Sequence, residues 1–260
     1  MKDFKIRCSA ISQIMGGTND LTDNQIKTIE DYSSREKLTI KQAETLNNLI
    51  EKRDTPPPLL QTAKTYCDNW IKEQLYNRRK EFTSKMTDKG LIMEDNSIDF
   101  IADQLGYGFL IKNEEYFPGE FMHGTPDVIL PDTVIDVKNS WDCFTFPLLD
   151  DDIPNNAYWW QGQGYMHLTG RKHYKLIYVL SDTPEHLIAR EAYWYAKNNG
   201  YEEVSTEIFN EFMDKMTYSD IPDKYKLKKF EFDYEPEAIE KIESQVIKCR
   251  NYINSKIANL

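Results

Sequence analysis

Three residues that lie close together in the sequence have the chemistry needed to hydrolyse a phosphate ester: Asp127, Asp136 and Lys138. Residues 133–139 are otherwise mostly apolar and β-branched, which is typical of a strand. In a strand, Asp136 and Lys138 share one face because they are two residues apart. The Pro-Asp pair at 131–132 is typical of a turn, so a hairpin would bring Asp127 alongside that face.

Two carboxylates and an ammonium on an apolar strand are costly unless something compensates their charge. A divalent cation does so, and oxygen ligands favour Mg²⁺, with Mn²⁺ as a substitute, over zinc. Such an ion lowers the pKa of a bound water and neutralises charge on a phosphodiester. Lys138 could position that water or stabilise the transition state. The competing interpretation is a surface hairpin with an Asp136–Lys138 salt bridge.

The composition and net charge of the chain limit which of these interpretations are possible. The chain has 260 residues, of which 40% are hydrophobic and 13% aromatic, so it can bury a sizeable core. Its net charge of −11 argues against a nucleic-acid partner, although charge can be segregated and a metal site itself needs carboxylates. The spacing of cysteine and histidine predicts no zinc site. Without a long apolar segment or secretory leader, the sequence predicts a cytoplasmic protein with no membrane contact.

Periodicity predicts the elements that must position these residues. Helices are expected in residues 5–16, 21–32, 38–49, 61–82, 87–105 and 156–168, after Thr183-Pro184-Glu185, and at the C-terminus. Strands are expected at 108–111, 125–130, 134–139, 174–180 and 229–234. Three prolines, Pro56 to Pro58, should separate the early helices from the rest.

This order predicts an α/β (α+β) fold, in which helices flank a central mixed β-sheet and helical additions lie at both ends. We expect one nuclease domain over residues 1–260. Within it we expect a helical insertion over 20–58, a catalytic core over 85–180 and a C-terminal helix over 235–260.

Four motifs carry a resemblance. The segment Gly124–Asp127 (GTPD), followed nine residues later by Asp136 and DVK, resembles the PD-(D/E)XK nuclease motif in its D-x-K form. Gly90–Glu94 and Gln161–Tyr165 resemble the G-x-x-x-E and Q-x-x-x-Y elements of the phage-exonuclease branch. The chain is therefore similar to the lambda-exonuclease and YqaJ-like viral recombinase group, well over 85–180 and weakly over 5–16. The resemblance implies a restriction-endonuclease-like core.

The resemblance also implies roles for the site residues. Asp127 and Asp136 would hold the metals together with the Val137 carbonyl, and Glu94 would contribute to a second metal or its waters. Lys138 would act on the nucleophilic water. A solvated acid on an acidic helix is the alternative for Glu94.

Two further residues come from the helix after the sheet. Gln161 would orient the water or Lys138, and Tyr165 would support the site or contact DNA. Gln163 could serve in place of Gln161, and core packing is the alternative for Gln161 and Tyr165.

Candidate DNA contacts lie in two places. The segment from Arg7 to Ser12 resembles the serine-bearing turn that helps bind terminal phosphate in this group, with Arg7, Ser9 and Ser12 as the candidates; Ser9 could instead be an N-cap. A basic run before Glu94 could track a DNA backbone or could be a solvated helix end. Its members are Arg78, Arg79, Lys80, Lys85 and Lys89.

These patterns predict a phage-type, metal-dependent exonuclease that degrades one strand of duplex DNA from an end, feeding recombination or repair. The resemblance alone implies 5′-to-3′ polarity, an annealing-protein partner and a homo-oligomer. The alternatives are an endonuclease of the same superfamily and a non-catalytic DNA- or protein-binding module on a nuclease fold.

Overall fold

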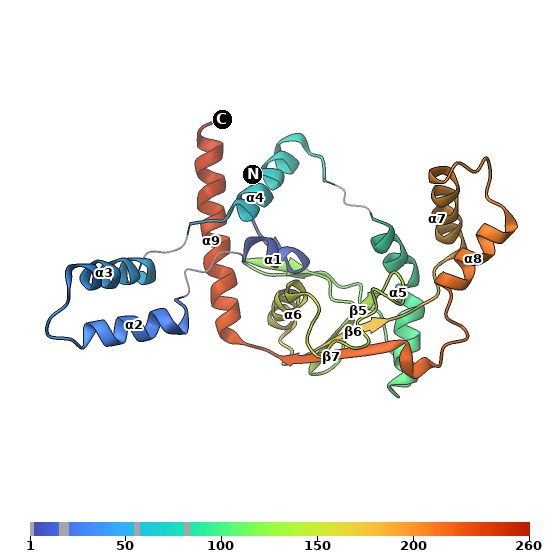
Figure 1. Cartoon of the computed structure of the whole chain (residues 1–260), viewed down its shortest axis with the longest axis horizontal. Helices are drawn as coiled ribbons and strands as arrows, with labels where there is room; N and C mark the ends of the chain where they lie inside the picture. The colour runs from blue at the N-terminus through green and yellow to red at the C-terminus, as the bar shows by residue number, and fades with distance from the viewer. Residues whose placement is uncertain (1–2, 16–20, 55–57, 81–83) are drawn as a thin grey trace. The chain divides into compact units, whose positions relative to one another are not determined.

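The computed structural model describes residues 3–15, 21–54, 58–80 and 84–260 (Figure 1). The chain forms two compact units. The first takes the described residues of 1–4, 12–78 and 241–260, and the second takes 5–11 and the described residues of 79–240. The expectation of one domain with a helical insertion over 20–58 stays a prediction. No helix in the described ranges is both long and apolar enough to span a membrane.

The first unit is helical. It contains α2 (Asp23–Ser33), α3 (Ile40–Asp54), α4 (Gln61–Tyr76) and the larger part of α9 (Pro236–Ala258). The start of α2 is a capping box in which the Thr22 side chain accepts from the Gln25 amide and Gln25 accepts from the Thr22 amide. Thr39 and Gln42 repeat this exchange at the start of α3.

Helix α4 is shorter than predicted. It ends at Tyr76 because Asn77 adopts a left-handed conformation with a φ of 47°. The predicted end at Phe82 lies outside the described residues, as do Pro56 and Pro57.

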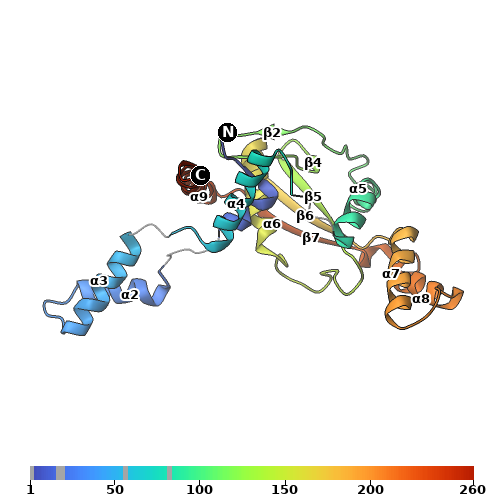
Figure 2. The ribbon, with the colours of Figure 1, turned by 90° about the horizontal axis from the view of Figure 1, so that it is seen from above.

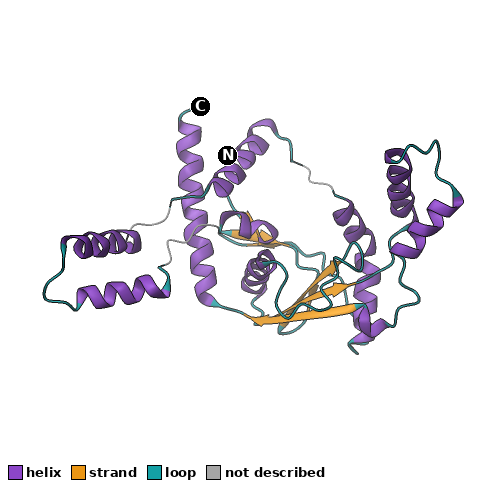
Figure 3. Cartoon of the chain, in the orientation of Figure 1, coloured by secondary structure: helices purple, strands orange, loops and turns teal. Residues whose placement is uncertain are grey.

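The second unit is built on a four-stranded sheet in the order β4-β5-β6-β7 (Figure 1). Its strands are β4 (Val128–Ile129), β5 (Thr133–Asn139), β6 (His173–Val179) and β7 (Leu227–Asp233). β5 and β6 are parallel, whereas β4–β5 and β6–β7 are antiparallel. The mixed sheet is therefore confirmed. It is flanked by α5 (Lys85–Gln104) and α6 (Asn156–Thr169), as Figure 3 shows.

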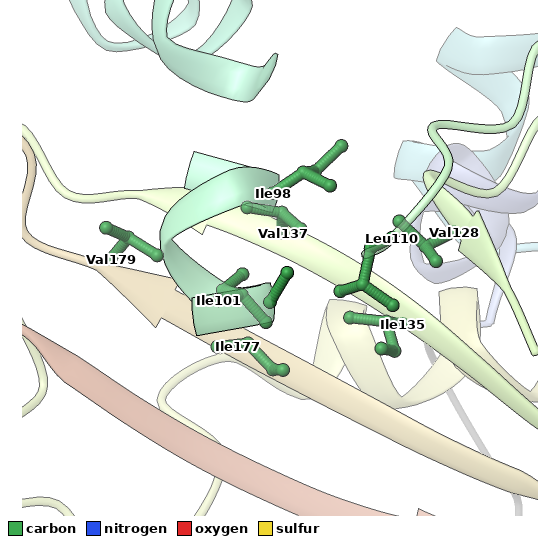
Figure 4. Close-up of a cluster of buried hydrophobic side chains, with 9 residues drawn as sticks. Ile98, Ile101, Leu110, Val128, Ile135, Val137, Ile177 and Val179 are labelled. Atoms are coloured by element: carbon green, nitrogen blue, oxygen red, sulfur yellow. The ribbon is translucent and has the colours of Figure 1, made fainter. Parts of the chain in front are cut away.

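The two faces of β5 carry different side chains. Ile135 and Val137 point to the face covered by α5, where they pack with Ile98, Ile101 and neighbours from β6 (Figure 4). Asp136 and Lys138 point to the opposite face, toward α6. The alternation thus separates an apolar layer from a layer that holds the charged residues.

Helix α6 lies close against the sheet because glycines face it. A Cβ atom at Gly162 would come within 2.5 Å of Phe232 on β7 and 2.9 Å of Tyr174 on β6. A Cβ at Gly164 would come within 2.7 Å of Ile11. The helix ends at Gly170, as predicted, with a φ of 71°.

A second, three-stranded sheet was not predicted. It joins β1 (Ile6–Arg7), β3 (Met122–Gly124) and β2 (Phe117–Pro118) in that order. A 3₁₀ turn, η1 (Cys8–Ala10), and α1 (Ile11–Ile14) follow β1. The short helix predicted in 5–16 is confirmed, but Ser9 lies inside η1 and is not its cap.

Other expectations need correction. Residues 108–111 are not a strand: Gly108 has a φ of 72°, and Phe109 and Ile111 are exposed. The strand expected over 125–130 is limited to β4. Helix α7 (Glu185–Asn198) begins after Pro184, and α8 (Thr206–Met216), which packs beside it (Figure 2), was not predicted. A short 3₁₀ turn, η2 (Asp223–Tyr225), precedes β7.

Candidate active site

A cleft of about 710 Å³ lies at the carboxyl end of β5 within the second unit. Residues from α5, β5, β6 and α6 line it, together with the loop after β5. They include Ser9, Met86, Gly90, Leu91, Glu94, Asp127, Lys138, Asn139, Trp141, Thr145, Tyr158 and Tyr178. Glu94, Asp127 and Lys138, which come from two of the sequence motifs, therefore line one concave surface, whereas Gln161 and Tyr165 do not line it.

Asp136 is fully buried and Lys138 is partly exposed, at 24% of its side chain. The two form an ion pair through Asp136 Oδ2 and Lys138 Nζ. Among the described residues, that oxygen accepts no further hydrogen bond. The other oxygen, Oδ1, accepts from Gln161 Nε2 at 2.9 Å.

Asp127 comes to the same place through the β4–β5 hairpin. Its Oδ2 accepts from the Val137 backbone amide at 2.7 Å, so the strand that carries Asp136 also orients Asp127. The pKa of Asp127 is raised to about 7: burial and then the charges of Asp136 and Glu94 raise it, and Lys138 and the hydrogen bond from Val137 oppose them. Two acids thus face each other in a site that resists a second negative charge.

In Lys138, the neighbouring charges have a larger effect on the pKa than burial has. Burial alone would lower the pKa of Lys138, but the charges of Asp136 and Asp127 outweigh burial and raise the pKa above its usual value. The side chain is therefore an ammonium at neutral pH. A fixed positive charge of this kind stabilises anions rather than removing protons.

Glu94 lies on α5 and lines the cleft, as the resemblance implies. Its carboxylate forms an ion pair with Lys112 Nζ at 3.2 Å, and Lys112 also contacts Asp95 at 2.8 Å. Glu94 is therefore near enough to act on Asp127 electrostatically while its own charge is partly satisfied by Lys112.

The donor set fits a divalent cation. Asp127, Asp136 and the Val137 carbonyl are oxygen donors, and a cation would relieve the repulsion that raises the pKa of Asp127. Within the described ranges, however, no group of three or more His, Cys, Asp or Glu side chains stands in ligand geometry. A cation here would complete its shell with water, as Mg²⁺ commonly does.

The two glutamines of α6 have different contacts. Gln161 meets Asp136, whereas Gln163 donates to the Asp233 carbonyl at 2.8 Å and accepts from the Glu235 amide at 2.8 Å. Gln163 thus ties α6 to the end of β7. Tyr165 is only 6% exposed and packs against Gly124, which favours the predicted support of the site over the predicted contact with DNA.

The structure also contradicts the predicted contact of Lys89 with DNA. It is fully buried, and its Nζ donates to the Trp141 carbonyl at 3.1 Å and the Ser181 carbonyl at 2.7 Å. Burial lowers the pKa of Lys89 to about 8. Lys89 therefore joins α5 to the loops after β5 and β6, and it does not present its charge to a DNA backbone.

The other candidate DNA contacts divide between the units. Burial, and then the charges of Arg7, Lys5 and Arg79, lower the pKa of His123, so these three cations form a cationic cluster around a neutral imidazole in the second unit. Ser9 lines the cleft in the same unit. Ser12 and Arg78 belong to the first unit.

Sequence reasoning passed over Tyr158 and Tyr178 as site residues, although both line the cleft. Tyr158 lies in the helix expected over 156–168, and Tyr178 lies in the strand expected over 174–180. The β5–β6 register pairs Tyr178 with Lys138, a relationship that the sequence of either strand alone does not contain.

Neither the models of protein families nor the curated proteins give a match to this chain. Solved structures do. A phage-related exonuclease from Haemophilus somnus 129PT has a TM-score of 0.71 and 23% identity, covering 99% of this chain and 97% of that one. The alkaline exonuclease LHK-Exo from Laribacter hongkongensis has a TM-score of 0.56 and 12% identity, covering 98% and 90%.

LHK-Exo in complex with dAMP gives a TM-score of 0.51 and 13% identity, covering 96% of this chain and 93% of that one. All three matches extend over nearly the whole length of both chains, and all three are exonucleases. The chain therefore has the fold of these phage-related and alkaline exonucleases.

Proposed function

We propose that this chain is a metal-dependent exonuclease that hydrolyses phosphodiester bonds from the ends of duplex DNA. The convergence of Asp127, Asp136, Lys138 and Gln161 supports this proposal most directly, with Asp127 and Lys138 lining the cleft and Asp136 and Gln161 buried behind them. The fold shared with exonucleases, one of them crystallised with dAMP, supports DNA as the substrate class.

The residues divide the chemistry among them. Asp127, Asp136 and the Val137 carbonyl would hold a divalent cation, with Glu94 beside them. When bound, that ion lowers the pKa of water and neutralises charge on the scissile phosphate. Mg²⁺ is the proposed ion, with Mn²⁺ as a substitute, because every donor is oxygen.

Lys138 supplies a positive charge where negative charge grows on the phosphate in the transition state. Gln161 keeps Asp136 in one orientation by donating to Oδ1. The cationic cluster of Lys5, Arg7 and Arg79 would attract the DNA backbone outside the cleft. These contacts, together with Ser9, Ser12 and Arg78, carry no sequence preference of their own.

We propose 5′-to-3′ polarity, an annealing-protein partner, homo-oligomer formation and a cytoplasmic location as the finer parts of this function. They follow from the sequence resemblance. Labelling the two ends of a duplex separately tests polarity, and light scattering tests the oligomer.

The deciding experiment measures release of nucleotides from linear, 5′-phosphorylated duplex DNA with Mg²⁺, with Mn²⁺ and with a chelator. Closed circular DNA and the variant Lys138→Ala are run in parallel. The proposal requires digestion of the linear substrate alone, dependence on the cation and loss in the variant. Cleavage of the circle would indicate an endonuclease, and DNA binding without turnover would indicate a binding module.

A further inference from the structure

One face of α6 contacts both members of the Asp136–Lys138 pair. Gln161 donates to Asp136, and Tyr158, three residues earlier on the same face, lies over Lys138. The distance from Lys138 Nζ to the centre of the Tyr158 ring is 5.3 Å. This distance is within the range at which the negative face of an aromatic ring attracts a cation.

The Tyr158 ring is supported from the sheet. Tyr178 on β6, the register partner of Lys138, meets Tyr158 edge-on with ring centres 6.2 Å apart and planes at 86°. Tyr178 is itself only 8% exposed and packs edge-on against Phe230 on β7 at 6.1 Å. The position of Tyr158 is therefore fixed by packing that begins in the neighbouring strands.

The ammonium of Lys138 is thus held between two attractions. The buried Asp136 carboxylate draws it into the sheet, and the Tyr158 ring draws it toward the wall of the cleft. With Asp136 alone, the flexible lysine side chain would be free to turn away from the cleft while keeping its ion pair. With the ring in place, the ammonium stays at the surface where a phosphate would lie.

We propose that Tyr158 is a positioning residue for Lys138 and that its ring, rather than its hydroxyl, holds the ammonium at the cleft wall. This inference rests on the proposed nuclease function, in which Lys138 acts on the scissile phosphate. It adds a role for a residue that the motif pattern does not include.

Two substitutions separate the ring from the hydroxyl. Tyr158→Phe keeps the ring and should leave kcat within about twofold of the wild type, whereas Tyr158→Leu should lower kcat about tenfold with a smaller change in KM. Tyr193→Leu, an exposed tyrosine on α7 that does not line the cleft, is the control and should change neither constant. Tyr158→Met replaces Tyr158→Leu if the leucine variant does not fold.

A second readout does not depend on turnover. In NMR spectra, the ring current of Tyr158 should shift the Hε protons of Lys138 upfield, and Lys138→Arg assigns the signal. The shift should persist in Tyr158→Phe and disappear in Tyr158→Leu. A Lys138 side chain that does not lie over the Tyr158 ring would show no upfield shift in the wild type, and the retained KM in Tyr158→Leu separates positioning from a loss of folded protein.

Three results would overturn the inference: wild-type kcat in Tyr158→Leu, an equal loss in Tyr158→Phe, or a Lys138 shift that does not respond to Tyr158→Leu. A wild-type protein without nuclease activity contradicts the proposed function instead. In that case the NMR comparison still decides whether the ring holds the ammonium.

Discussion

Gln161 Nε2 lies 2.9 Å from Asp136 Oδ1 and is the side-chain donor that orients this buried carboxylate from the helix after the sheet. Replacing Gln161 with alanine should lower kcat by about 10- to 100-fold, because groups that orient metal ligands typically contribute this much. The lost hydrogen bond should also cost about 1–3 kcal/mol of stability. Steady-state nuclease assays and thermal unfolding measure the two effects.

Gln163→Ala is the matched control. It removes two hydrogen bonds that join α6 to the end of β7, so it should lower the unfolding temperature while kcat is retained at temperatures where the protein is folded. An equal loss of kcat in both variants would show that Gln161 acts only through the stability of α6.

The raised pKa of Asp127 predicts how cation binding depends on pH. The folded-state pKa of about 7 lies above the ordinary value of 3.8, so the protonated carboxyl favours folding. That contribution is fully present below pH 3.8 and is lost as pH rises through 7. Without a divalent cation, the unfolding temperature of the wild type should therefore fall across this window relative to that of Asp127→Asn.

Mg²⁺ should restore the lost stability at pH values at which Asp127 is ionised. At a concentration tenfold above its dissociation constant, the ion should stabilise the protein by about 1.4 kcal/mol. The rise in unfolding temperature should be larger at pH 8 than at pH 5.5 and should vanish in Asp127→Asn. An equal rise in that variant would place the ion elsewhere.

The burial of Lys89 predicts that it makes no contact with DNA phosphates. Arg79→Ala should reduce the slope of log affinity against log salt by about one, because an exposed arginine in the cationic cluster is lost. Lys89→Met should leave that slope unchanged and lower the unfolding temperature, since two carbonyls lose their donor. Fluorescence anisotropy over a salt series, without divalent cations, measures the slopes. A reduced slope in Lys89→Met would restore the original expectation for this lysine.

Replacing a glycine by alanine should lower stability in α6 and raise it in α5. Gly162→Ala would push a Cβ atom into Phe232 and Tyr174 and should cost about 1–3 kcal/mol. A Cβ at Gly90 meets no described atom within 4 Å, so Gly90→Ala should add about 0.5–1 kcal/mol through helix propensity. Chemical denaturation measures both. Similar stabilities for the two variants would mean that α6 can move away from the sheet at little cost.

The sequence was most informative where a single element carries the signal. The β-branched run of β5 predicted both its conformation and the shared face of Asp136 and Lys138, and the turn after β4 predicted the approach of Asp127. The helices with clear caps, α2 and α3, were also predicted within two residues at their starts. In each case the determining contacts are local.

What the sequence did not predict depends on distant partners. Strands of two or three residues, such as β1 and β2, are too short to show a period and exist only because β3 lies between them. Lys89 belongs to a basic run that resembles a solvated helix end, yet carbonyls more than fifty residues away in the sequence accept its hydrogen bonds. The pairing of Tyr178 with Lys138 likewise arises from the parallel register of β5 and β6.

The hydrogen bond that orients Asp127 comes from the backbone of position 137 rather than from a side chain. Every amino acid except proline offers the same N–H at this position. Substitutions at position 137 other than proline therefore keep the hydrogen bond that orients Asp127. They change the packing of this strand against α5 instead. The contact that holds Asp127 is therefore lost when the backbone of β5 changes, and not when the side chain at position 137 changes.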